Sequence, residues 1–137
     1  MNIESFDDLL QAARQQSQPQ RLLFVFARIE LPPDATAEQR ARFEAGQGGA
    51  LVPLMCVDKT PQELSGFAAL VEESRQFELP DAAWGMVFVA AMGGRDGQAP
   101  SSQDADQPLQ RMVEDIKRGA IGAYLPLDRE GRPVRLA

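Results

Sequence analysis

The amino-acid sequence predicts a single α/β domain spanning residues 1–137. We expect a sandwich in which helices pack on a parallel or mixed sheet of about five strands, with a β-hairpin at the C-terminus. Three nearly continuous apolar runs, each suited to a buried strand, occur at Leu22–Ile29, Ala50–Val57 and Trp84–Ala91. Segments with helical periodicity and helix-start signals separate these runs. The length of 137 residues, 44% of them hydrophobic, suits one domain with a substantial core.

The first element is an amphipathic helix near the N-terminus. Apolar residues recur there at helical spacing, at Phe6, Leu9, Leu10 and Ala13. Ser5 is well placed to cap this helix, and the polar stretch Gln15–Gln20 ends it. The strand Leu22–Ile29 follows, and its continuous apolarity predicts a central strand that is covered on both faces.

A short helix and a second strand come next. Thr36 and Gln39 have the spacing of a capping box, which predicts a helix over Ala37–Ala45. Three glycines then end this helix, at Gly46, Gly48 and Gly49. The strand Ala50–Val57 contains Pro53, which cannot donate a ladder hydrogen bond. Pro53 therefore indicates either an edge strand or a β-bulge.

The third helix has the clearest start signal in the chain. Thr60-Pro61-Gln62-Glu63 offers an N-cap, a proline at the first helical position and an acid two positions later. A stripe of mostly apolar residues continues behind it, at Leu64, Phe67, Leu70, Val71, Ser74 and Phe77. We therefore predict a helix over Pro61–Gln76.

The remaining elements follow the strand Trp84–Ala91. The polar, glycine-containing stretch Gly93–Gln107 is predicted to be the longest irregular segment and a mobile loop. A helix then begins at Pro108 or nearer Ser102, and Gly119 suits its C-terminal cap. Two short stretches, Gly122–Leu127 and Arg132–Leu136, flank the turn Asp128–Gly131, in which Gly131 suits the left-handed position. This pattern predicts the terminal hairpin.

Charge and composition argue against several classes of partner. The fourteen Lys and Arg residues face twenty Asp and Glu residues, so the net charge is −6, and there is no basic run. Binding to nucleic acid or to an anionic membrane surface requires basic surface, so we expect neither. The stretch Met1–Leu10 carries acidic residues where a signal peptide has basic ones. We expect a cytoplasmic protein.

The residue inventory also limits the chemistry. The chain has no histidine and a single cysteine, Cys56. Catalytic triads, histidine metal ligands and paired redox cysteines are therefore excluded. We assign no catalytic residue, and we expect no metal and no cofactor.

The best candidate for a binding site is an edge formed by two strand ends. Cys56, Asp58 and Lys59 lie where the second strand ends, and a glycine-rich turn follows the third strand, at Gly93, Gly94, Arg95 and Asp96. In open α/β sheets, ligands bind beyond the carboxyl ends of the strands. Structural roles are the commoner alternative: Cys56 as a small buried hydrophobe, the charged residues and the turn as solvated surface.

Three segments of the chain resemble a family of bacterial proteins. They are Arg21–Ala27, Gly48–Lys59 and Pro108–Val113, and the resemblance extends over nearly the whole chain. Members of this family often carry the label "ribonucleotide reductase subunit alpha". The catalytic subunit of such a reductase uses a cysteine radical and several further cysteines, whereas this chain has only Cys56. No catalytic residue is carried over, and the resemblance implies at most an accessory role in nucleotide metabolism.

Three hypotheses about function follow. The leading hypothesis is a non-enzymatic module that binds a partner protein or a small ligand, as a monomer or a homodimer. The alternative is a thiol-dependent enzyme or redox accessory that uses Cys56. The third, carried by the family label alone, is an accessory protein of nucleotide metabolism.

Overall fold

The computed structural model describes residues 5–31, 33–45, 49–81 and 83–135. Its helices and strands follow in the order α1 (Phe6–Arg14), β1 (Gln20–Glu30), α2 (Ala37–Glu44), β2 (Ala50–Lys59), a 3₁₀ turn η1 (Pro61–Glu63), α3 (Phe67–Arg75), β3 (Met86–Gly93), α4 (Ser102–Lys117) and β4 (Leu125–Asp128).

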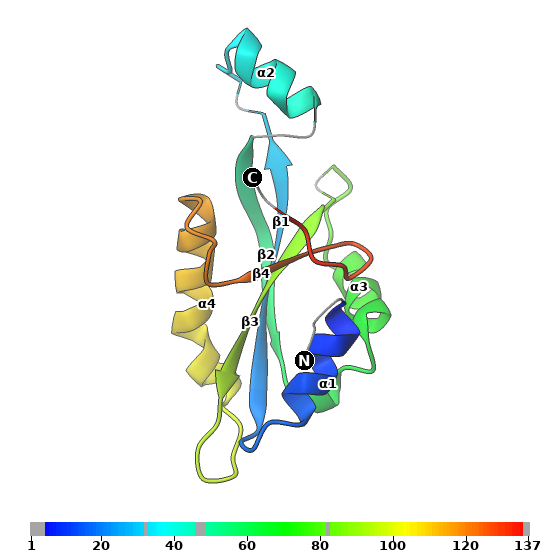
Figure 1. Ribbon diagram of the computed structural model, residues 1–137, viewed down its shortest axis with the longest axis vertical. Helices are drawn as coiled ribbons and strands as arrows, with labels where there is room; N and C mark the ends of the chain where they lie inside the picture. Colours follow the sequence, from blue (N-terminus) through cyan, green and yellow to red (C-terminus); the bar gives the residue numbers. More distant parts are fainter. Residues whose placement is uncertain (1–4, 32, 46–48, 82, 136–137) are drawn as a thin grey trace.

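The strands form one four-stranded sheet in the order β2-β1-β3-β4, and every neighbouring pair is antiparallel. The prediction of a parallel or mixed sheet of about five strands was therefore wrong. A parallel crossover needs a helix with an apolar stripe to cover the sheet. None of the residues of α2 is buried, so α2 cannot serve as that helix. Instead β2 folds straight back along β1, and α2 lies at the tip of this hairpin, away from the rest of the sheet (Figure 1).

Helices cover both faces of the sheet. Figure 1 shows α1 and α3 on one side and α4 on the other. Side chains of β1 alternate between the two cores: Phe24 and Phe26 pack toward α1 and α3, and Leu23 and Val25 pack toward α4. Since β1 is central and buried on both faces, its continuous apolar sequence is explained.

Pro53 marks an edge strand and a bulge at the same time. β2 is the outermost strand of the sheet. The register with β1 shifts between Phe26, which pairs with Met55, and Ala27, which pairs with Pro53, so Leu54 is the extra residue. The edge tolerates the missing N–H of Pro53.

The predicted helix Pro61–Gln76 is divided into two pieces. One bond of the Thr60–Glu63 motif forms, with the Thr60 N–H donating to Glu63 Oε1 at 2.9 Å, while the Glu63 N–H donates to the Thr60 carbonyl oxygen at 3.0 Å. The helical turn that begins here is only η1, because the backbone adopts an extended conformation at Leu64 and Gly66, before α3 begins. The cap of α3 comes from a distant segment: the N–H of Phe67 donates to Asp7 Oδ1 at 3.2 Å.

The fourth helix begins at the earlier of its two predicted starts. α4 runs from Ser102 with Pro108 inside it, and the bond from the Asp104 N–H to Ser101 Oγ (3.0 Å) caps it. Almost half of the predicted loop Gly93–Gln107 therefore belongs to β3 or α4. Gly119 follows α4 with φ +77°, as its predicted role requires.

The chain turns back at Asp128–Gly131 with Gly131 at φ +81°. The predicted partner strand Arg132–Leu136 is reduced, over residues 132–135, to an isolated bridge between Pro133 and Leu127. Backbone hydrogen bonds of 2.9 Å flank this bridge, from the Asp128 N–H to the Arg132 carbonyl oxygen and from the Val134 N–H to the Pro126 carbonyl oxygen. Gly46, Gly48 and Leu136 lie outside the described residues.

Candidate functional site

Both halves of the predicted binding edge lie at the same end of the sheet. β2 and β3 each run antiparallel to β1 from opposite sides, so their carboxyl ends meet the start of β1. Leu22 pairs with Lys59 on one side and with Ala91 on the other, and Gln20 pairs with Gly93. One strand, β1, therefore separates Asp58 and Lys59 from the glycine-rich turn.

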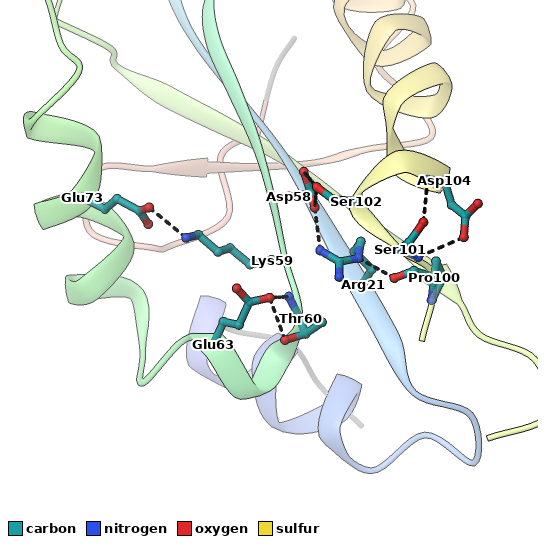
Figure 2. A network of polar contacts seen from close by, with 10 residues as sticks. All are labelled: Arg21, Asp58, Lys59, Thr60, Glu63, Glu73, Pro100, Ser101, Ser102 and Asp104. Carbon is teal, nitrogen blue, oxygen red and sulfur yellow. Dashed lines mark hydrogen bonds and ion pairs between the residues drawn. The ribbon is translucent and has the colours of Figure 1, made fainter. Parts of the chain in front are cut away.

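Asp58 belongs to a structural clamp between three elements (Figure 2). Its Oδ2 lies 2.5 Å from Nη1 of Arg21 on β1, and Ser102 Oγ of α4 donates to both carboxylate oxygens, at 2.9 and 2.7 Å. The Nε of Arg21 donates to the carbonyl oxygen of Pro100 at 2.5 Å. The side chains of Arg21 and Asp58 are only 14% and 15% exposed. The carboxylate is thus already engaged in joining β1, β2 and α4.

Lys59 points to the opposite face of the sheet. Its Nζ lies 2.8 Å from Oε1 of Glu73 on α3. Figure 2 shows this ion pair on the far side of β2 from the Asp58 clamp. Asp58 and Lys59 therefore do not form one site, because adjacent strand residues point to opposite faces.

The glycine-rich turn is built by its own backbone bonds. Asp96 (φ 53°) and Gly97 (φ 78°) are the central residues of a two-residue turn, and Arg95 and Gln98 exchange hydrogen bonds of 3.0 and 2.9 Å across it. The Asp-Gly pair is the sequence signal for this turn, and it was missed in the sequence analysis.

Gly94 is needed for close packing. Its N–H donates to the carbonyl oxygen of Pro19 at 2.8 Å, and a Cβ there would lie 2.0 Å from the carbonyl oxygen of Gln98. The amides of Gly94, Arg95 and Gly97 are all engaged within the protein, so they do not form a free phosphate cradle.

Cys56 is exposed on β2 but has unfavourable surroundings for a reactive thiol. Partial burial raises its pKa above the ordinary value of 9.0, and the negative charges of Asp58 and Asp106 raise it further. Activated thiols have a lowered pKa and electropositive neighbours. At neutral pH this thiol is protonated.

An apolar groove between β2 and α3 is the feature that sequence analysis missed. Its volume is about 340 Å³, and it is lined by Phe26, Met55, Cys56, Val57, Leu70, Glu73, Ser74 and Phe77. A smaller hollow shares Met55 and Phe77 with it and is completed by Leu54, Glu78 and Leu79. Phe77 is 70% exposed and Leu79 is 69% exposed. A signal was present, since two large apolar residues, Phe77 and Leu79, lie between the end of α3 and Pro80.

The outer edge of β2 runs beside this groove. Among the described strands, β2 pairs with β1 alone. In the part of the chain that the structure describes, the backbone bonds of turns, loops and caps do not involve Ala50–Lys59. The outward N–H and C=O groups of β2 are therefore open to a partner.

Comparison with protein-family models, with curated proteins and with solved structures found no match to this chain. Within the described ranges, no group of three or more Cys, Asp or Glu side chains is arranged to hold a metal ion. Nor is any helix there long and apolar enough to cross a membrane.

Proposed function

We propose that this protein is a non-enzymatic binding module that docks a partner protein on the β2 edge surface. This surface is defined by the outer edge of β2, the groove beside it, and the side chains of Met55, Val57, Phe77 and Leu79. The observation that carries the proposal is the exposure of Phe77 and Leu79 next to the groove. Contiguous apolar patches of this kind mark interaction sites on soluble proteins.

The energy available at the β2 edge surface supports the proposal. Full burial of one Phe or Leu side chain contributes about 1.5–3 kcal/mol. A few well-packed apolar anchors can supply most of the affinity of an interface. Two such anchors would contribute about 3–6 kcal/mol to a contact, before the cost of association is subtracted.

The other groups that the sequence offered as a binding site are already engaged within the protein, which supports assigning the function to the β2 edge surface. Asp58 and Lys59 are held in ion pairs with Arg21 and Glu73, and the glycine-rich turn is closed by its own bonds. The raised pKa of Cys56 opposes a thiol-dependent reaction. We also propose that the protein is cytoplasmic, because a lone cysteine stays reduced in that compartment. The family resemblance suggests a partner from nucleotide metabolism.

Photo-crosslinking in the cells that make the protein tests the proposal. A photoreactive phenylalanine analogue replaces Phe77 in one variant and Glu114 in a control. Glu114 is exposed on α4, which covers the opposite face of the sheet. We expect a defined protein adduct from position 77 only, lost when Leu79→Asp is added. Equal adducts from both positions, or none from position 77, would overturn the proposal.

A further inference from the structure

We propose that the partner docks by strand addition: an extended segment of another protein pairs with β2 as a fifth strand and places alternate apolar side chains in the groove. This inference rests on the proposed function and specifies the occupant of the β2 edge surface. The backbone of β2, the shape of the groove and the charges around it each contribute to it.

The backbone of β2 is open over one regular stretch. From Met55 to Lys59 the register with β1 is unbroken. The bulge and Pro53 lie on the other half of the strand, and both are devices that protect an edge from pairing. The half next to the groove has neither device, so a partner strand can pair there.

The groove lies where side chains of an added strand would point. Met55 and Val57 face the α3 side of the sheet, together with Phe24 and Phe26 of β1. Successive side chains of a strand alternate between faces, so residues i and i+2 of a strand paired with β2 would enter the space between β2 and α3. An edge strand beside a helix-lined groove is the arrangement that recognises extended peptides, with backbone bonds for affinity and pockets for specificity.

A second copy of this chain fits the groove less well. If β2 paired with β2 of another copy, the side chains on the α3 side would be Met55 and Val57, which already pack against their own core. They would leave the groove of the other copy unfilled. On the opposite face, the exposed Asp106 lies near Cys56 at this edge, so pairing would also bring acidic groups of both copies together.

The charges along the edge of β2 favour a basic segment. Glu73 lines the groove and Glu78 lines the adjoining hollow, but Lys59 and Arg129 already pair with these two carboxylates. On the α4 side, Asp106 forms no ion pair with any residue in the described ranges. The whole chain carries a net charge of −6. We therefore expect Lys or Arg in the segment at positions that face the α4 side, between its alternating apolar residues.

Selection from a displayed library of random short peptides tests the inference on the full chain. We expect the enriched peptides to share apolar residues at i and i+2 with Lys or Arg nearby. Binding should protect backbone amides of Met55–Lys59 from hydrogen exchange. Met55→Lys should weaken binding at least tenfold, whereas Met92→Lys, at a half-buried methionine of β3, should leave it within twofold. Thermal unfolding of each variant checks that it is folded.

A second measurement does not depend on any variant. Two versions of an enriched peptide are methylated at every second backbone nitrogen, each at one of the two alternating sets, which leaves the side chains unchanged. We expect methylation of one set to abolish binding, and methylation of the other set not to do so. Enriched peptides with helical spacing, equal binding by both methylated sets, absence of enrichment, or a stable homodimer in native mass spectrometry would overturn strand addition. If strand addition is overturned in this way but position 77 still crosslinks to another protein, the proposed function stands and the partner docks by another mode.

Discussion

At the residue scale, Trp84 shows how single contacts organise one side of the molecule. Its indole N–H donates to Ser74 Oγ at 2.9 Å, and its ring meets Phe26 edge-on with centroids 5.0 Å apart. The guanidinium of Arg129 lies 4.4 Å from the ring centroid and also donates to Glu78 Oε1 and to the Trp84 carbonyl oxygen. Arg129 thereby ties the turn after β4 to the segment that carries Phe77 and Leu79.

Loss of Arg129 should destabilise the fold. We expect Arg129→Met to lower the free energy of unfolding by about 1–3 kcal/mol, because it removes two charged hydrogen bonds and the cation–π contact. Denaturant unfolding measures this. Arg132→Met, at a side chain that is 73% exposed, is the matched control and should change stability by no more than about 0.5 kcal/mol. Equal effects of the two substitutions would contradict this account.

Glu78 should make stability depend on pH. The hydrogen bond from Arg129, assisted by the Trp84 N–H, lowers the pKa of Glu78 below its ordinary value of 4.5. A carboxyl group with a lowered pKa in the folded state contributes stability that is present above the unfolded value. That stability is lost as the pH falls through the folded value. Below pH 4.5, Glu78→Gln should therefore lose less stability with falling pH than the parent chain. Identical acid dependence would refute the role of Glu78.

The Cys56 thiol should react slowly and respond to its acidic neighbours. Because the Asp106 charge raises the pKa of Cys56, Asp106→Asn should lower it and speed alkylation by iodoacetamide at pH 8. Glu114→Gln removes a charge from the outer face of α4 and should not change the rate. Fast alkylation of the unmodified protein at neutral pH would revive the thiol-dependent alternative.

At the element scale, the positions of strands and helices could be predicted because periodicity and caps are local. The Phe6–Ala13 stripe and the Thr36–Gln39 box produced α1 and α2 within a residue or two of the prediction. The break before α3 could not be predicted, because Leu64 is buried in the core and the cap of α3 comes from Asp7, far away in the sequence.

The turn after β3 should be intolerant of a side chain at Gly94. A Cβ there would lie 2.0 Å from the Gln98 carbonyl oxygen and 2.7 Å from that of Pro19. We expect Gly94→Ala to cost about 1–3 kcal/mol of unfolding free energy, since backbone must move. Gly122, which has open space around its Cβ position, provides the control, and Gly122→Ala should be close to neutral. Stability retained in Gly94→Ala would show that the turn is not tightly packed.

At the scale of the whole molecule, strand direction was the main thing that the sequence could not determine. Direction depends on whether α2 packs on the sheet, and its weak apolar face was the only local hint. The antiparallel order leaves β2 at an edge and brings the end of α3 beside it. The candidate site could not be predicted for the same reason: its groove joins residues of β1, β2 and α3 that only the topology brings together.

The β2 edge surface follows from this arrangement. Helices cover both faces of the sheet, and β1 and β3 are paired on both sides. The outer backbone of β2, Phe77 and Leu79 remain uncovered among the residues that the structure describes. We infer that the molecule uses this surface to bind another protein.

The most direct measurement is the pair of photo-crosslinking yields from positions 77 and 114, taken in the cells that make the protein. We predict one defined adduct with another protein from position 77, none from position 114, and loss of the first on Leu79→Asp in a chain that is still folded. No adduct from position 77, or equal yields from both positions, would contradict the claim that the β2 edge surface docks a partner.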